Sequence, residues 1–328
     1  MDDEQFRDKQ VLITGGLGFI GSNLARRLVA LGAKVTLVDS LVPQYGGSLY
    51  NIDGIQDQVR VNISDVRDGY SMSYLVQGQD ILFNLAGQTS HVDSMQDPYA
   101  DLDINCRAQL TILEACRKHN PGIRIVLAST RQMYGKPEYL PVDEEHLLRP
   151  VDVNGINKMA GERYHILYSN VYGIRACALR LTNTIGPRMR IKDSRQTFLG
   201  TWIRLVVQGK PFEVWDGNQL RDFTYVDDAV DALLLAAASE KTNSQIFNLG
   251  GDCVISLKDL ASLLVEVNGG GEYSIRPYPP EKKRIDIGSY YANFNLIQSV
   301  LNWRPKVLLS DGLARTLAFY RKNLQHYL

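Results

Sequence analysis

The sequence has few cysteines and no long apolar segment. Its four cysteines form no CxxC pair, and its five histidines are dispersed. This spacing offers no zinc-binding pattern and is typical of free thiols in a reducing cytoplasm. No apolar run approaches the roughly 18 residues that cross a bilayer, and the charged first ten residues lack the apolar core of a signal peptide. We therefore expect a cytoplasmic protein without a metal site and without a membrane partner.

Neither sign of charge is in excess. Lys and Arg number 36 and Asp and Glu number 36, so the formal net charge is zero. Proteins that neutralise many phosphates of a nucleic acid are normally basic, so we expect no nucleic-acid partner. Hydrophobic residues make up 45% of the 328 residues and charged residues 22%, a globular composition whose length suffices for two domains.

Short apolar runs alternate with helix-length amphipathic stretches in the first half of the chain. Stretches 20–30 and 110–119 have the length and pattern of helices. Residues 11–14, 35–39, 59–62, 81–85 and 123–129 have the apolar character of buried parallel strands. The alternation predicts an α/β fold with a Rossmann-type, doubly wound parallel sheet.

The character of the sequence changes after about residue 180, where turn signals become frequent and the predicted strands shorter. We predict a dinucleotide-binding domain over residues 1–180 and a smaller α/β substrate lobe over residues 181–328. Residues of about 222–249 are expected to return to the main sheet, so the two parts interleave.

A glycine-rich turn directly follows the first predicted strand and opens the first helix. Gly15, Gly18 and Gly21 satisfy the spacing GxxGxxG. Glycines let the backbone approach a pyrophosphate, and the helix N-terminus offers free N–H groups. The second strand ends at Asp39, whose carboxylate suits a ribose diol and repels a 2′-phosphate. These features predict NAD, not NADP, as the cofactor.

Further motifs occur in the order of a known family. They are TGGLGFIG, the strand-end Asp39, FNLAG, MYG after Ser129 and Thr130, LRLTNTIGPR and RDFTYVDD. Together they resemble the extended short-chain dehydrogenases/reductases of the NAD-dependent nucleotide-sugar epimerase/dehydratase group. The resemblance implies a nucleotide-diphosphate sugar, a UDP-sugar being favoured, between the two lobes. It also implies a homodimer that pairs through residues 99–119 and 153–172.

The predicted cofactor site combines the glycine turn with the ends of the following strands. Residues 65–66 follow the third strand near the expected adenine, and residues 85–87 end the fourth strand with small side chains. The resemblance adds the lysine that binds the nicotinamide ribose. The predicted NAD-binding residues are Gly15, Gly18, Phe19, Ile20, Gly21, Asp39, Ser40, Asp65, Val66, Leu85, Ala86, Gly87, Asn105 and Lys158.

The predicted catalytic set, Thr130, Asn154 and Lys158, departs from the family at one position. The family uses Ser or Thr with a YxxxK pair on one helix face, and here Asn154 stands at the place of the tyrosine. Asparagine is no proton acceptor. Three interpretations remain open. The enzyme is active with another base (Tyr134, His91 or Lys158), the chain binds its ligands without turnover, or the asparagine is an inactivating substitution.

The two residues after Thr130 distinguish reactions within the family. Sugar dehydratases carry Asp-Glu there and decarboxylases Ser-Glu, whereas this chain carries Arg131 and Gln132. Without that carboxylate pair, the sequence favours an epimerase acting most simply at C4 through a transient keto-sugar. The alternatives are a dehydratase or decarboxylase with a non-standard base, and an inactive binding protein. Arg131 is a candidate partner for a substrate carboxylate or, equally, a structural residue.

The substrate lobe supplies most of the expected ligand contacts. By resemblance, Asn183 contacts the diphosphate or sugar, Arg221 clamps the diphosphate, and residues 196–202 line the nucleotide base. A second basic residue is expected at 283 or 284. The predicted substrate-binding residues are Gln88, Arg131, Asn183, Arg188, Arg221, Lys283 and Arg284.

Overall fold

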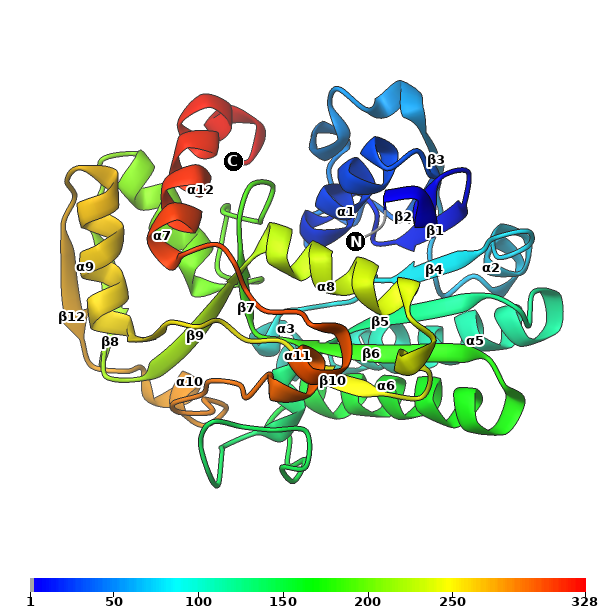
Figure 1. Cartoon of the computed structure of the whole chain (residues 1–328). Coiled ribbons are helices and arrows are strands. Elements are labelled where there is room, and N and C mark those ends of the chain that lie inside the picture. The colour runs from blue at the N-terminus through cyan, green and yellow to red at the C-terminus, as the bar shows by residue number, and fades with distance from the viewer. Residues whose placement is uncertain (1–2) are drawn as a thin grey trace.

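Seven parallel strands form the main sheet in the computed structural model, which describes residues 3–328. The strand order is β10-β6-β5-β4-β1-β2-β3 (Figure 1). The strands are β1 (Gln10–Thr14), β2 (Lys34–Asp39), β3 (Val59–Ile63), β4 (Ile81–Asn84), β5 (Arg124–Thr130), β6 (Arg175–Leu181) and β10 (Ile246–Asn248). The predicted doubly wound sheet is confirmed, and the five predicted strands agree with β1–β5 to within one residue at each end.

Helices cover both faces of this sheet because its strands are apolar on both faces. Val11 and Ile13 of β1 pack in one buried cluster and Leu12, between them, in another. This alternation follows from the two-residue period of a strand. One face carries α1 (Phe19–Ala30) and α8 (Val226–Ala238), and the other carries α2 (Gly69–Leu75), α5 (Ala108–His119) and α6 (Val153–Tyr172) (Figure 1).

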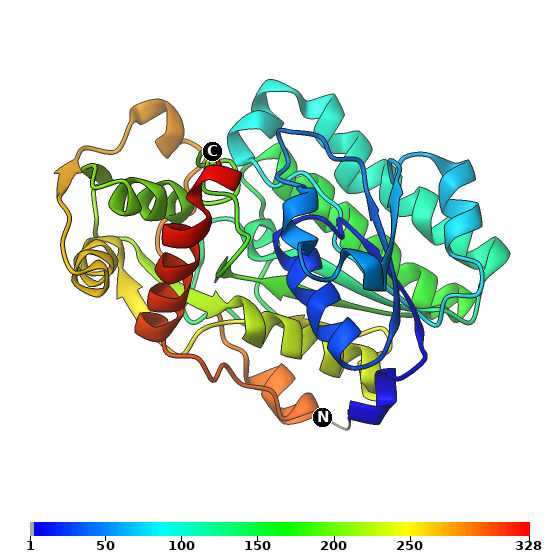
Figure 2. The same cartoon turned by 90° about the horizontal axis from the view of Figure 1, so that it is seen from above.

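The smaller lobe contains two short sheets and three longer helices. The order of its three-stranded sheet is β11-β9-β7, and β8 pairs with β12. The helix α12 (red in Figure 2) contacts α7 and α9. It also reaches the first lobe, where Asn323 accepts a hydrogen bond from Tyr50. The elements are β7 (Asn183–Ile185), β8 (Phe212–Trp215), β9 (Leu220–Tyr225), β11 (Val254–Ser256), β12 (Tyr273–Arg276), α7 (Phe198–Val207), α9 (Leu257–Asn268) and α12 (Leu309–Asn323).

The expected return to the main sheet is made by α8 and β10, while residues 222–225 belong to β9 of the small lobe. Shorter elements complete the chain. They are α3 (His91–Gln96), α4 (Pro98–Leu102), a π-helical turn (Asp103–Arg107), α10 (Pro280–Lys283) and α11 (Asn295–Leu301), with single 3-10 turns that include Arg131–Tyr134. Within residues 3–328, no helix has both the length and the apolar character needed to span a membrane.

Candidate functional site

The glycine turn between β1 and α1 presses against the end of β4. A Cβ at Gly15 would lie 3.0 Å from backbone atoms of Ala86, and a Cβ at Gly21 would lie 2.2 Å from the Gly15 carbonyl oxygen. Side chains are therefore excluded from both positions. Gly18 is the N-cap of α1 and offers no side chain to cap it, so the first N–H groups of the helix are available to a ligand.

A small cavity lies beside this turn at the carboxyl ends of the parallel strands β1 and β4. The strand order reverses between these two strands, because β2 and β3 follow on one side of β1 and β5 and β6 follow on the far side of β4. All of the predicted cofactor-binding residues except Asn105 and Lys158 line it. These lining residues are Gly15, Gly18, Phe19, Ile20, Gly21, Asp39, Ser40, Asp65, Val66, Leu85, Ala86 and Gly87.

Two carboxylates border this cavity in different states. Asp39 accepts hydrogen bonds from the amides of Leu17 (3.1 Å) and Leu41 (2.9 Å), and burial raises the pKa of its carboxyl above the ordinary value. Asp65 pairs with Arg67 at 2.6 Å, and that hydrogen bond holds the pKa of Asp65 below its ordinary value. Asp39 thus faces a ligand with oxygens that are already oriented, whereas the Asp65 charge is largely used by its neighbour.

Lys158 lies next to Gly87 beyond the end of β4. A Cβ on Gly87 would lie 2.8 Å from the Lys158 Nζ and 2.9 Å from the Asn105 Oδ1. Burial lowers the pKa of Lys158, and the charge of Asp101 acts in the opposite direction. The two predicted residues that do not line the cavity therefore lie directly behind its glycine wall.

Asn154 belongs to a buried network centred on Asp101, whose side chain is fully buried. The Asn154 Nδ2 donates to Asp101 Oδ2 (2.9 Å) and to the backbone oxygen (3.0 Å) and side-chain oxygen (3.1 Å) of Gln88. Asn105 and Asn157 also donate to the Asp101 carboxylate. Asn154 is 1% exposed. Its side-chain amide therefore connects α6 to Asp101 of α4 and to Gln88, which follows β4.

Thr130, Gln132, Asp152 and His91 form a chain of contacts that reaches the larger cavity. The Thr130 hydroxyl oxygen accepts a hydrogen bond from the Gln132 amide, and the Gln132 side chain donates to Asp152 Oδ2 at 2.8 Å. His91 Nδ1 lies 2.9 Å from the same oxygen. Burial raises the pKa of Asp152, but its contacts with His91 and the donated hydrogen bonds outweigh burial and lower it overall. Asp152 is therefore a buried anion at the first turn of α6.

Tyr134, one of the alternative bases considered, is fully buried away from both cavities. Its hydroxyl donates to Asn248 (2.7 Å) and accepts from Arg180 (2.6 Å), which is itself paired with the buried Glu162. Burial raises the pKa of Tyr134 to about 12. Its hydroxyl is thus committed to structure, which leaves His91 and Lys158 nearer to the cavities.

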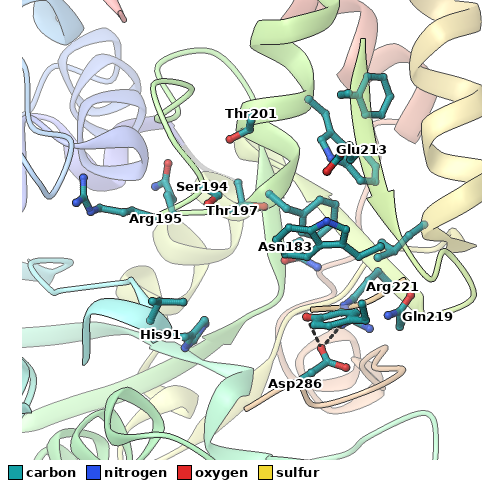
Figure 3. Close-up of a pocket in the computed structure, with 18 of the residues that line it drawn as sticks. His91, Asn183, Ser194, Arg195, Thr197, Thr201, Glu213, Gln219, Arg221 and Asp286 are labelled. Carbon is teal, nitrogen blue, oxygen red and sulfur yellow. Dashed lines mark hydrogen bonds and ion pairs between the residues drawn. The ribbon is translucent and has the colours of Figure 1, made fainter. Parts of the chain in front are cut away.

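The larger cavity has a volume of about 900 Å³ and lies between the two lobes. Of the predicted substrate-binding residues, Arg131, Asn183 and Arg221 line it. His91 and Arg195 lie on one side of this cavity, and Asn183, Arg221 and Asp286 lie on the other (Figure 3). Within the predicted base-binding segment 196–202, Gln196, Thr197, Phe198, Thr201 and Trp202 also line it.

Four predicted substrate-binding residues lie outside the lining of this cavity. Arg188 donates to Asn23 at 2.9 Å and stacks on the Phe319 ring, so it joins α1 to α12. Lys283 and Arg284 are exposed, and Lys283 lies 3.5 Å from Asp216. Gln88 is buried in the Asp101 network. Each of these side chains either interacts with another residue of this chain or is exposed to solvent.

The model of the NAD-dependent epimerase/dehydratase family matches residues 11–250. The chain belongs to this family. It is 30% identical over 331 residues to UDP-glucuronic acid decarboxylase 1 of Xenopus tropicalis, covering 97% of this chain and 73% of that protein. It is 28% identical over 320 residues to UDP-glucose 4-epimerase of Mycolicibacterium smegmatis, covering 96% and 100%. The UDP-glucose 4-epimerase of Thermotoga maritima, solved with UDP-glucose, superposes with a TM-score of 0.86 and 28% identity over 96% of this chain and 99% of that chain.

The residues of this family member fit the dinucleotide that the family name implies. The turn at Gly15 and Gly21 admits no side chain, the N-terminus of α1 has unused N–H groups, and Asp39 offers carboxylate oxygens for ribose hydroxyls. The small cavity measures about 150 Å³, and Gln196 lines both cavities. A dinucleotide would therefore extend from the small cavity toward the larger one.

Sequence reasoning missed several residues that the structure brings to the site. Asp101 and Asp152 lie 51 residues apart along the chain, yet both hold groups around α6. The sequence did contain a signal for Asp152. It stands two residues before Asn154, at the expected start of the helix that carries Asn154 and Lys158, and aspartate is a preferred N-cap residue. Arg195 pairs with Asp93 at 2.7 Å across the rim of the larger cavity, and no local pattern signals that contact.

Proposed function

We propose that this chain is an NAD-dependent epimerase of nucleotide-diphosphate sugars that acts through a transient keto-sugar, most simply at C4. The main support is that the glycine-lined cavity and the 900 Å³ cavity share the lining residue Gln196, so that a cofactor in one would lie next to a substrate in the other. Ligand pockets of about 300–1,000 Å³ suit molecules of this size. Bound NAD would accept a hydride from the sugar and return it to the same carbon.

The polarity of the larger cavity supports a nucleotide-diphosphate sugar. Arg131 and Arg221 contribute positive charge, and Trp202, Trp215 and Tyr278 contribute aromatic surface. Arginine recognises phosphate oxygens through its planar fork, and aromatic rings suit a nucleobase. The UDP-sugar relatives support UDP as the nucleotide.

The side chains after Thr130 support epimerisation over elimination. Arg131 carries no carboxylate, and the Gln132 amide is used by Asp152. Neither group is able to deprotonate a sugar carbon and reprotonate a leaving oxygen. Epimerisation needs only a proton acceptor at the sugar hydroxyl, so it makes the smaller demand on this site.

We assign the role of this proton acceptor to His91. Its side chain lines the larger cavity and is 40% exposed, while the Asp152 side chain beside it is fully buried. The Asp152 carboxylate oxygen lies 2.9 Å from Nδ1, an ion-pair distance without the alignment of a hydrogen bond. A small rotation of the ring that aligned an Nδ1 proton with this oxygen would leave Nε2 as the acceptor. The Asp–His arrangement would thus supply the base that Asn154 does not, with Thr130 and Lys158 holding the sugar and the cofactor.

A non-catalytic binding protein is the second candidate. It is favoured by Asn154, whose amide is committed to three buried acceptors at the place of the usual tyrosine. Both candidates predict ligand binding, but only the enzyme predicts reduction of the cofactor or inversion of a sugar carbon.

The deciding experiment incubates the NAD-loaded protein with UDP-, CDP-, dTDP- and GDP-sugars and analyses the products by mass spectrometry and NMR. We expect one sugar to give a product of unchanged mass with one inverted carbon. Loss of water or carbon dioxide would replace epimerisation by elimination or decarboxylation. Thermal stabilisation by a sugar nucleotide without any product would establish the binding protein.

We extend the proposal to a homodimer in the cytoplasm. Apolar side chains remain exposed on α4 and α6, including Tyr99 (77%), Leu167 (50%) and Val171 (61%). These two helices contact each other, so their exposed side chains can contribute to one interface. Light scattering coupled to size-exclusion chromatography tests it, and a mass of 36.8 kDa in solution would contradict it.

A further inference from the structure

Arg131 is held beside the larger cavity by contacts that leave part of its guanidinium unused. Its guanidinium stacks on the Tyr290 ring at 5.1 Å, and Nη2 donates to the Asn183 Oδ1 at 3.1 Å. Nη1 is buried and has no hydrogen-bond partner among the described residues. The Nδ2 of Asn183 is in the same condition. Two unused donors therefore belong to two side chains that are hydrogen-bonded to each other.

Such donors are costly unless a ligand satisfies them. A buried N–H group without a partner costs roughly 1–3 kcal/mol, and more when the group is charged. Burial lowers the pKa of Arg131, which reflects the same loss of hydration. Stacking on Tyr290 holds the plane of the guanidinium but leaves Nη1 without an acceptor. The pair is thus organised for an acceptor that is absent from the protein itself.

The neighbouring acidic residues do not supply that acceptor. Asp286 lies 3.7 Å from Arg221. Asp222 accepts from the amides of Gly251 and Ala292, and burial raises its pKa to about 6. No carboxylate among the described residues forms an ion pair with Arg131, although Asp222 and Asp286 both influence it electrostatically. The region around Arg131 and Arg221 therefore has cationic groups to offer to an anion.

Arg131 and Arg221 lie close enough for their charges to interact, but they belong to different lobes. Arg131 directly follows Thr130 at the end of β5, and Ala128 of this strand lines the small cavity. Arg221 lies on β9 in the small lobe. A sugar held near Thr130 for hydride transfer brings its own substituents, and not the distal nucleotide, to Arg131.

Resting on the function proposed above, we propose that Arg131 and Asn183 bind a carboxylate carried by the sugar, so that the substrates are nucleotide-diphosphate uronic acids. A planar carboxylate accepts two parallel hydrogen bonds from a guanidinium and an amide, whereas a neutral hydroxymethyl group leaves the charge unpaired. Neutral sugars are then rejected by the unpaired charge itself. A relative of 30% identity named for UDP-glucuronic acid is consistent with this class.

The test measures the affinities of NAD-loaded protein for UDP-glucuronate, UDP-glucose and UDP by calorimetry. We expect wild-type protein to bind UDP-glucuronate at least tenfold more tightly than UDP-glucose. In Arg131→Met, which retains a long side chain over Tyr290, UDP-glucuronate affinity should fall about 10–100-fold, the range for a lost hydrogen bond to a charged group. UDP affinity should change less than threefold. Arg131→Lys, which keeps the charge but not the fork, should lie between the two.

A matched control is Arg321→Met on α12, an exposed arginine that donates to Asn268 and lies outside both cavities. It should leave all three affinities unchanged. Equal loss of UDP and UDP-glucuronate in Arg131→Met would assign Arg131 to the diphosphate and overturn the inference. Equal wild-type affinity for UDP-glucose and UDP-glucuronate would overturn it as well. Those outcomes leave the epimerase proposal standing if UDP-glucose is converted. Absence of binding by all three ligands would overturn the inference, and the product screen with all four nucleotides tests the epimerase proposal separately.

Discussion

The Lys158 ammonium occupies the space that a side chain at Gly87 would need, because a Cβ there would lie 2.8 Å from Nζ. Gly87 has no left-handed backbone conformation that would itself require glycine. The absence of a side chain is thus needed by the neighbour and not by the local backbone. This contact ties the wall of the small cavity to the lysine that the family motif identifies.

Gly87→Ala should weaken NAD binding about tenfold, equivalent to about 1.4 kcal/mol. The added methyl group would push Lys158 and the Asn105 side chain from their positions, at 2.8 Å and 2.9 Å from the new atom. Calorimetric titration with NAD measures the effect. Gly122→Ala is the control, because a Cβ there meets nothing within 4 Å. Unchanged NAD affinity in Gly87→Ala would remove Lys158 from the cofactor site.

Asn154→Leu should lower the free energy of unfolding by about 1–3 kcal/mol, the cost of leaving buried acceptors unsatisfied. The leucine has a similar size but no donor for Asp101 or Gln88. Urea denaturation at neutral pH measures the change. Leu308→Ala, at a residue that is 68% exposed and lies outside the proposed dimer helices, provides the comparison and should change stability much less. If both variants unfold alike, the network contributes no net stability.

His91→Gln should lower kcat for the proposed epimerisation by about 10²–10⁴-fold, the usual contribution of a general base, with a smaller change in KM. His91→Ala should regain part of its activity when imidazole is added, because the side chain borders the 900 Å³ cavity. Steady-state kinetics on the sugar identified by the product screen measures both effects. His119→Gln, an exposed histidine at the end of α5, is the control. Full activity in His91→Gln would show that His91 is not the base, and would leave Lys158 or a water molecule as the proton acceptor.

Acid should destabilise the protein through His165, which is buried and neutral. Nδ1 donates to the Gly161 carbonyl, so Nε2 is left to accept from the Asn84 amide at 3.2 Å, and burial lowers the pKa to about 4. An unfolded histidine titrates near 6.5. The contribution of neutral His165 to the free energy of unfolding is therefore fully present above about pH 6.5 and is lost as the pH falls toward 4. Between pH 7 and pH 5 this histidine should contribute a loss of about 2 kcal/mol.

Denaturant unfolding of wild-type and His165→Gln protein at pH 7 and pH 5 isolates that contribution. The variant lacks the titrating group, so its stability should change about 2 kcal/mol less between the two pH values. All other titrating groups are common to both proteins and cancel in the difference. Equal pH dependence in the two proteins would show that His165 takes up its proton without a cost to folding.

The sequence by itself determined the main sheet and the glycine turn. These features are local and periodic. A strand buried on both faces is a mostly apolar run such as residues 35–38. A turn that closes on its own backbone at Gly21 and on the end of β4 at Gly15 requires glycine at both positions. Asp39 could likewise be placed at the end of its strand by counting along the chain. None of these inferences depended on which distant segments would meet.

Only the tertiary structure decided which polar side chains are used within the protein and which face a ligand. The sequence does not show whether the polar groups of Tyr134 and Arg188 are exposed or buried. In the folded chain, Tyr134 forms hydrogen bonds with Arg180 and Asn248. Arg188 donates a hydrogen bond to Asn23. The Asp101 network and the unused donor of Arg131 also arise from segments separated by tens of residues. The physical reason is that a buried polar group must find partners wherever the folded chain brings them, and that choice is invisible to local pattern.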